Sequence, residues 1–199
     1  MNKFYNYYFL LLGFCFSVTI NIPTDYSTIQ AGINAANNGD LIRIAPGIYY
    51  ENLKVEKSIT IASHYIDNDG TVGGDLSHQT NTTIDGSQAG PNDMLGGCML
   101  FRPPLGENFI DIELIGLTIR YGKGTIAKVN EGTPDVPIYK YEKYGGGIFV
   151  YKGEDVTIKY NKFQNNGSNN VNNGGALFLS SSDDIGFDDR TYDSSSRTN

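Results

Sequence analysis

Residues 144–166 read YGGGIFVYKGEDVTIKYNKFQNN, and much of this pattern returns at residues 173–192 as NGGALFLSSSDDIGFDDRTY. Both stretches hold a pair of glycines, a short apolar run, a polar turn and a second short run. An earlier stretch, GGCMLF, has the same beginning. The glycine pairs before the apolar runs are Gly96–Gly97, Gly146–Gly147 and Gly174–Gly175. Fixed motifs at variable spacing are typical of a solenoid whose coils differ only in loop length.

The second runs of these stretches also align. Ile112, Leu114 and Ile119 match Val156, Ile158 and Phe163, which in turn match Ile185, Phe187 and Tyr192. A coil of about 20–30 residues cannot bury its own apolar face, whereas stacked coils pair their strands in parallel and share one core. Glycine permits the backbone bends at the corners. Asparagine at positions 161, 165 and 166 suits left-handed or side-chain-bonded turns.

Short strands account for most of the chain after residue 40. The apolar runs lie at 41–45, 52–55, 58–63, 82–86, 98–101, 110–120, 147–150, 156–163 and 176–179. Turn residues such as Pro46 and Gly47 separate them, and no helical periodicity lies between them. A βαβ fold needs such helices. The sequence therefore predicts an all-β domain over residues 21–199.

One short amphipathic helix is predicted at residues 27–38. Its apolar face contains Ile29, Ile33 and Ala36. Ser27 and Gln30 form a capping-box pattern at its start, and Gly39 is a suitable C-terminal stop. Because the end of a solenoid exposes apolar side chains and unpaired strand edges, this helix is expected to cover that end.

The N-terminus, MNKFYNYYFLLLGFCFSVTI, has one lysine followed by an apolar core from about Tyr7 to Phe16. This core is short for a membrane span and is typical of a secretory signal peptide; a buried strand is the alternative interpretation. We expect a signal peptide at residues 1–20, cleaved near Ser17 to Ile20. The protein is then secreted or held at the extracellular cell surface, with no transmembrane span after cleavage.

Removal of this segment leaves Cys98 as the one cysteine of the chain. A secreted protein with a single thiol has no internal disulfide, so packing and backbone hydrogen bonds must stabilise it. Cys98 lies in the apolar run GGCMLF, and we expect it to be buried in a packing role.

The formal net charge of −7 argues against nucleic acid as a partner, since nucleic-acid binders carry a basic face. Acidic polysaccharides are repelled on average, although a local basic patch would still bind them. The sequence indicates no oligomeric state.

The stretch DYSTIQAGINAANNGDLIRIAPGIYYENLKVEKSITIAS, residues 25–63, resembles the opening of pectin lyase-like parallel β-helix proteins, and pectin methylesterases open in a similar way. The later IDGS, IGLTIRYGKG and VTIKYNKFQNN resemble coils of the same superfamily, so the likeness covers about residues 25–192. It implies a right-handed parallel β-helix with an N-terminal capping helix, in agreement with the right-handed crossover rule. GGGI, GGAL and FQNN are also similar to the short repeats of polymorphic outer-membrane adhesins.

The catalytic motifs of these relatives are not found in the sequence. Methylesterases of this fold use two Asp and an Arg, and pectate lyases use an Arg base with Ca²⁺ held by acidic residues. The arginines are Arg43, Arg102, Arg120, Arg190 and Arg197, and none lies in a matching motif. Ca²⁺ is therefore expected only through the resemblance, and we identify no catalytic residue, metal ligand or cofactor.

Polygalacturonase-type hydrolysis needs clustered carboxylates, and the one dense acidic group, between residues 183 and 193, is interpreted as solvated turns. The other potential metal ligands also have simpler interpretations. The stretch YIDNDG, residues 65–70, lacks the Asp and Glu that a calcium loop needs at its first and last positions. His64 and His78 flank it without the paired spacing of zinc ligands, and we interpret them as surface residues.

The best candidate for a binding site is the long insertion between Arg120 and Gly145, which ends in PIYKYEKY. Its candidate ligand-binding residues are Tyr139, Lys140, Tyr141, Lys143 and Tyr144. Tyrosine rings offer apolar faces on which sugars stack, and lysine can meet hydroxyls or a uronate carboxylate. The alternatives are a tyrosine-rich surface loop and an edge strand packed on the coils.

The final residues, SSSDDIGFDDRTYDSSSRTN, begin another coil and contain no amphipathic cap. We therefore expect a β-helix domain that continues beyond Asn199. One function that follows is a secreted or cell-surface module that binds polysaccharide, a cell-surface glycan or another surface. The other is the N-terminal part of a polysaccharide lyase or esterase whose active site lies downstream. An Arg or Lys beside carboxylates on adjacent coils would favour the second, and the sequence shows none.

Overall fold

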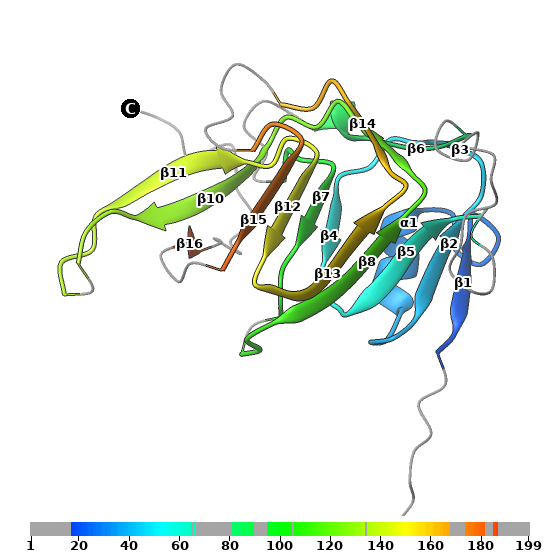
Figure 1. The fold of residues 1–199 in the computed structure, drawn as a ribbon, viewed down its shortest axis with the longest axis horizontal. Helices are drawn as coiled ribbons and strands as arrows, with labels where there is room; N and C mark the ends of the chain where they lie inside the picture. The colour runs from blue at the N-terminus through cyan, green and yellow to red at the C-terminus, as the bar shows by residue number, and fades with distance from the viewer. Residues whose placement is uncertain are drawn as a thin grey trace, which may run out of the picture.

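Three sheets of parallel strands form the body of the computed structural model (Figure 1). The structure describes residues 17–64, 66, 81–89, 95–104, 106–133, 135–167, 174–181 and 185–186. Sheet A consists of β1 (Thr19–Ile22), β2 (Leu41–Ile44), β5 (Ile59–Ser63), β8 (Ile110–Ile115) and β13 (Gly153–Lys159). Sheet B consists of β3 (Gly47–Tyr49), β6 (Thr82–Asp85), β9 (Thr118–Arg120) and β14 (Lys162–Gln164). Sheet C consists of β4 (Leu53–Val55), β7 (Met99–Phe101), β12 (Ile148–Tyr151) and β15 (Leu177–Ser180). The all-β prediction is confirmed.

The chain visits sheets A, B and C in rotation. The successive rounds are β2-β3-β4, β5-β6-β7, β8-β9-β12 and β13-β14-β15. Each strand pairs in parallel with the equivalent strand of the next round. Because side chains alternate across a strand, those that point inward in one round lie above those of the previous round and form one core.

The register between β8 and β13 confirms part of the alignment made from sequence. Val156 pairs with Ile112, Ile158 pairs with Leu114, and one sheet further on Phe163 of β14 pairs with Ile119 of β9. The aligned apolar residues therefore lie directly above one another in successive rounds.

Two parts of the repeat alignment were wrong. In sheet C, Ile148 pairs with Met99 and with Leu177, so the matching glycines are one position earlier than expected, at Gly145–Gly146. The strand β16 (Ile185–Gly186) also does not add to sheet A. It pairs antiparallel with residues of the insertion, which places Ile185 opposite Val129. The other two residues aligned there, Phe187 and Tyr192, lie outside the described residues.

Tight corners divide two of the predicted runs into separate strands. The run 110–120 bends between β8 and β9 at Gly116, whose φ is +71°. The equivalent bend between β13 and β14 is at Tyr160, whose φ is +58°. Side chains rarely adopt this left-handed conformation, so the stacking of the two rounds determines the corner even where the residue is not glycine.

Asparagine side chains connect the fourth round to the third. Asn161 donates from its side-chain amide to the carbonyl of Leu114 at 2.7 Å and accepts from the N–H of Leu117 at 2.9 Å. Asn166 likewise donates to the carbonyl of Ile119 at 2.7 Å. Asn165 between them has a φ of +50°. The predicted turn roles of these asparagines are confirmed.

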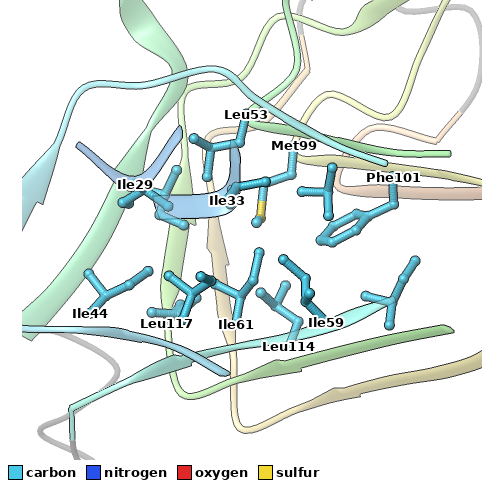
Figure 2. Packing of buried hydrophobic residues seen from close by; sticks show 14 of the residues in the cluster. Ile29, Ile33, Ile44, Leu53, Ile59, Ile61, Met99, Phe101, Leu114 and Leu117 are labelled. Carbon is cyan, nitrogen blue, oxygen red and sulfur yellow. The ribbon is translucent and has the colours of Figure 1, made fainter. Parts of the chain in front are cut away.

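A single α-helix among the described residues, α1 (Ile29–Ala35), covers the N-terminal end of the core. Its buried residues include Ile29 and Ile33. Figure 2 shows both beside Leu53 and Met99, across the core from the sheet A residues such as Ile61. The predicted capping helix is therefore present at this end.

The boundaries of α1 differ from the prediction. Thr28, not Ser27, is the N-cap, and its hydroxyl accepts from the N–H of Ala31. The carboxylate of Glu51 accepts from two further N–H groups of the first turn, so a distant residue completes the cap. The helix ends at Ala35, before Gly39. Gly39 has a positive φ, but it lies in the turn that follows and does not end the helix.

The first described strand lies across the predicted signal-peptide boundary. β1 begins at Thr19 and pairs with β2, and its Ile20 and Ile22 side chains are buried in the core. A boundary at residue 20 would divide this strand. Residues 1–16, with the apolar core of the predicted signal peptide, lie outside the described ranges.

Candidate functional site: the tyrosine hairpin

The long insertion before Gly145 forms an antiparallel hairpin of two strands, not a loop. β10 (Thr125–Asn130) pairs with β11 (Tyr139–Tyr144) over six residue pairs, and β16 adds to the other edge of β10. The side-chain oxygen of Asn130 accepts from the N–H groups of Gly132 and Ile138 across the connection. We call β10, β11 and their connection the tyrosine hairpin. It projects past β15 at one end of the molecule (Figure 1).

The inner face of the tyrosine hairpin packs on the outside of sheet C. The hairpin side chains that point toward sheet C form an inner row, which includes Tyr144, 4% exposed, and Ala127, fully buried. Tyr144 contacts Phe149 and Phe178, with ring centroids 5.5 and 4.7 Å apart. Leu100 completes this row of sheet C. The insertion therefore covers apolar side chains that would otherwise face solvent.

The outer face of the tyrosine hairpin carries exposed aromatic rings. Tyr139 and Tyr141 are 53% and 55% exposed, and their spacing of two places both on this face. Lys128 lies directly opposite Tyr141 and its ammonium nitrogen is 3.8 Å from the ring centroid of Tyr139. This is a cation–π contact between diagonal neighbours of an antiparallel pair.

Lys143 belongs to the same outer face, because it pairs with Ile126. It is half-buried. Together with Lys128 it gives this face two cationic side chains beside the two tyrosines. Glu142, the one carboxylate within the two paired strands, lies on the opposite face.

Lys140 lies on the inner row, opposite Val129, where two carboxylates bind it. It forms ion pairs with Glu131 and, at 2.8 Å, with Glu142. The hydrogen bonds that the Lys140 ammonium donates to these two carboxylates raise its pKa. A hydrogen bond from Lys140, with one from Tyr144, lowers the pKa of Glu142. This arrangement neutralises Lys140 and directs the carboxylates of Glu131 and Glu142 toward it.

The five residues chosen from sequence thus separate into two sets. Tyr139, Tyr141 and Lys143 share the outer face, whereas Lys140 and Tyr144 lie on the inner row and are used by the fold. Sequence reasoning missed Lys128. The alternation in TIAKVN is a strand signal that could have identified it, but only the strand pairing places it against Tyr139.

The described arginines of sheets B and C are bound in structural ion pairs. Arg120 donates to Asp85 at 2.8 Å, and Arg102 lies 2.7 Å from Glu56. Burial of Asp85 opposes its ionisation, but hydrogen bonds from Ser87 and Arg120 outweigh burial, and the pKa of its carboxyl is lowered. Each of these two arginines is held by a carboxylate, and the structure shows neither of them in the position of a catalytic base.

A calcium ion does not fit the described side chains. Within the described ranges, His, Cys, Asp and Glu nowhere gather in a set of three that could hold a metal ion. The acidic stretch 187–193, the residues around 183 and the loop 67–80 with His78 lie outside the described residues. We therefore assign no step to Ca²⁺.

Cys98 is fully buried between rounds, as predicted. Its thiol donates to the carbonyl of Arg120 at 3.1 Å, and it is a free cysteine. Burial raises the pKa of the Cys98 thiol to about 12. A neutral thiol without thiolate character is a poor nucleophile, which agrees with a packing role.

A broad groove of about 880 Å³ lies over the outer face of sheet A. Its walls include Thr60, Glu113 and Thr157. Glu113 accepts from the hydroxyl of Thr60 and forms an ion pair with Lys159 at 3.1 Å. Glu113 is therefore bound by neighbours on both sides.

Among the helices that the structure describes, none has the length and apolar character needed to cross a membrane. Comparison of the chain with protein-family models, curated proteins and solved structures finds no match. The geometry of the tyrosine hairpin is therefore the basis for inferring function.

Proposed function

We propose that this chain is a secreted, right-handed parallel β-helix module that binds acidic carbohydrate through the outer face of the tyrosine hairpin. The rotation of the chain through three parallel sheets and the helix over the first round support the architecture. The right-handed form follows from the strong preference for right-handed crossovers between parallel strands.

One observation carries the binding proposal. Tyr139 and Tyr141 expose their rings on the same face as Lys128 and Lys143. Two carboxylates of the hairpin, those of Glu131 and Glu142, instead bind Lys140 of the inner row. Exposed rings beside cations suit a chain of sugar rings that carries carboxylates. The lysines of this face attract an anionic ligand locally, against the average repulsion from the net charge of −7.

The rigidity of the hairpin also suits a binding role. Its inner face is fixed by Tyr144, Phe149 and Phe178, so the outer tyrosines are held on a packed support. A ligand that stacks there loses less free energy to ordering than it would on a flexible loop.

The test is binding of polygalacturonate and of a neutral galactan to the purified chain by calorimetry. Replacing Tyr139 and Tyr141 together by Ala should weaken polygalacturonate binding by about tenfold or more, from loss of ring stacking. Lys128→Met should weaken binding of polygalacturonate and reduce its salt dependence, with little change for galactan.

Tyr50→Ala is the matched control, since Tyr50 is 54% exposed and follows β3, far from the hairpin in Figure 1. Its binding should equal that of the unchanged chain. Polygalacturonate binding that survives the double replacement, or an equal loss in the Tyr50 variant, would exclude the hairpin as the site.

A further inference from the structure

The two ends of the stacked rounds are covered differently. At the first end, α1 lies over the core and Ile29 and Ile33 are almost fully buried. At the other end, β13, β14 and β15 are edge strands, and no described strand pairs with their outer edges. The one described strand after β15, β16, pairs with β10 and not with sheet A.

Side chains of the last round are less buried than their equivalents one round earlier. Val156, Ile158, Phe163 and Leu177 are half-buried, whereas their partners Ile112, Leu114, Ile119 and Ile148 are 3%, 0%, 0% and 0% exposed. Leu179 is 52% exposed, although its partner Val150 is 1% exposed. The apolar core is therefore open at this end, and covering it would be favourable.

The backbone of β13 presents hydrogen-bonding groups at the same edge. The carbonyl of Lys159 accepts from the N–H of Gly116, next to β8, so Lys159 directs its backbone groups toward β8. Successive residues of a strand direct their backbone N–H and C=O groups alternately toward one side of the strand and toward the other. The N–H and C=O groups of Val156 and Ile158 therefore point away from β8, as a template for a further strand.

We propose that a second copy of this chain pairs with the open edge of β13, antiparallel, about a twofold axis at Thr157. This register places Val156 of each copy opposite Ile158 of the other. Both residues direct their backbone groups outward, so they form a hydrogen-bonded pair on each side of the axis. The two apolar side chains point toward the core and extend it across the contact.

Charge complementarity supports this occupant and this register. Asp155 and Lys159 lie on the same side of β13 as Thr157, away from the core. The twofold axis places Asp155 of each copy opposite Lys159 of the other, so that Lys159, which already pairs with Glu113 of its own copy, gains a second carboxylate at each of the two points. A shift of one residue would place backbone groups that point away from β8 opposite groups that point toward β8, and these cannot form hydrogen bonds with each other. The hydrogen bonds therefore favour the same register as the charges.

A disulfide across the axis tests the geometry directly. In this register Thr157 faces its own copy as a non-hydrogen-bonded pair, with Cα atoms about 4.5 Å apart, within the range of a disulfide. Under mild oxidation, Thr157→Cys in the chain that begins at Val18, and therefore lacks Cys15, should form a covalent dimer. Asp155→Cys is the control. Residue 155 of one copy lies opposite residue 159 of the other, so the two introduced cysteines are four residues apart along the strands, about 13 Å. Cys98 is buried and does not compete.

Sedimentation velocity of the full chain tests association without a cross-link. The unchanged chain should form a dimer at micromolar concentration. Asp155→Lys places like charges opposite each other at two points and should weaken the dimer by about tenfold. Adding Lys159→Asp to that variant restores opposite charges and should recover most of the affinity. Circular dichroism checks that each variant is folded.

Several outcomes would overturn the proposal. A monomer at all concentrations would show that no second copy covers the edge. Equal oxidation of the Thr157 and Asp155 variants would show random contact. A dimer that is unchanged by Asp155→Lys, or that the second replacement does not recover, would place the contact on another surface. None of these measurements uses carbohydrate, so the result is independent of the proposed binding function.

Discussion

The ring of Tyr144 packs against the ring of Phe178, with their centroids 4.7 Å apart. Tyr144 ends the second strand of the tyrosine hairpin, and Phe178 lies in β15, a strand of sheet C. This contact fixes the hairpin to the stacked rounds. It also determines that the inner row is structural and that Tyr139 and Tyr141 face solvent.

Tyr144→Ala should destabilise the fold by about 3 kcal/mol, because it removes a large buried aromatic side chain and leaves a cavity beside Phe149 and Phe178. Urea unfolding followed by circular dichroism measures this change. Tyr141→Ala, on the outer face, should alter the free energy of unfolding by less than about 0.5 kcal/mol. Similar costs for the two variants would contradict the assignment of inner and outer faces.

Asn166→Ala should cost about 1–3 kcal/mol, since the carbonyl of Ile119 and the N–H of Gly122 both lose their side-chain partner. Asn166→Asp keeps an acceptor for Gly122 but cannot donate to Ile119, so its destabilisation should be partial if the carboxylate remains solvated. Chemical denaturation of the three proteins ranks them. If Asn166→Ala is as stable as the unchanged chain, the link between the third and fourth rounds contributes nothing.

The Asp85–Arg120 ion pair should make stability fall in acid. The pKa of Asp85 is lowered in the folded state from its ordinary value of 3.8, so its stabilisation is complete above that value and is lost as the pH falls through the folded-state pKa. Thermal melts between about pH 5 and pH 2 should show this loss. Asp85→Asn should have a shallower pH dependence over the same range. Parallel curves would exclude Asp85 as a source of the acid sensitivity.

Cys98 should resist thiol reagents in the folded protein. Its pKa is raised to about 12 by burial, so at pH 8 almost none is thiolate, and the side chain is inaccessible. Labelling with iodoacetamide, measured by mass spectrometry, should therefore be at least about a hundredfold slower than in urea. Rapid labelling without denaturant would mean that the rounds around Cys98 open readily.

The proposed secretion predicts cleavage that leaves Val18 as the mature N-terminus. Its backbone nitrogen lies 2.8 Å from a side-chain oxygen of Asp40, and β1 begins one residue later. Cleavage after Ser17 has small residues, Cys15 and Ser17, at the positions that signal peptidase reads, and it leaves β1 whole. N-terminal sequencing of the secreted protein measures the site. A terminus beyond Ile20 would remove half of β1 and contradict the assigned strand.

The repeat explains why so much of the strand order could be predicted. Val156 and Ile158 match Ile112 and Leu114 in sequence because equivalent rounds must place apolar side chains at the same inward positions. The glycine alignment failed by one residue, since a run of three glycines at 145–147 fits two registers equally well. Pairing of Ile148 with Met99 selects one of them, and a one-residue shift would turn every side chain of the strand to the other face.

Other features depended on residues far apart in the chain. Glu51 helps to cap α1, and Ile185 pairs with the tyrosine hairpin instead of adding to sheet A. Neither contact has a local signal, because it joins groups that are adjacent only after the rounds have stacked. The sequence motif at the end of the chain resembled another round, but the apolar inner row of the hairpin offered Ile185 a different buried position.

The sequence by itself determined the all-β class, the N-terminal helix and the inward residues of successive rounds, since local turn chemistry and repeated apolar patterns specify them. It also indicated the tyrosine-rich insertion. Only the tertiary structure decided which tyrosines of that insertion face solvent. Alternation along β11 makes two faces, but the apolar outer row of sheet C, Leu100, Phe149 and Phe178, determines which face is buried. Burial of that row turns Tyr144 inward and leaves Tyr139 and Tyr141 beside Lys128.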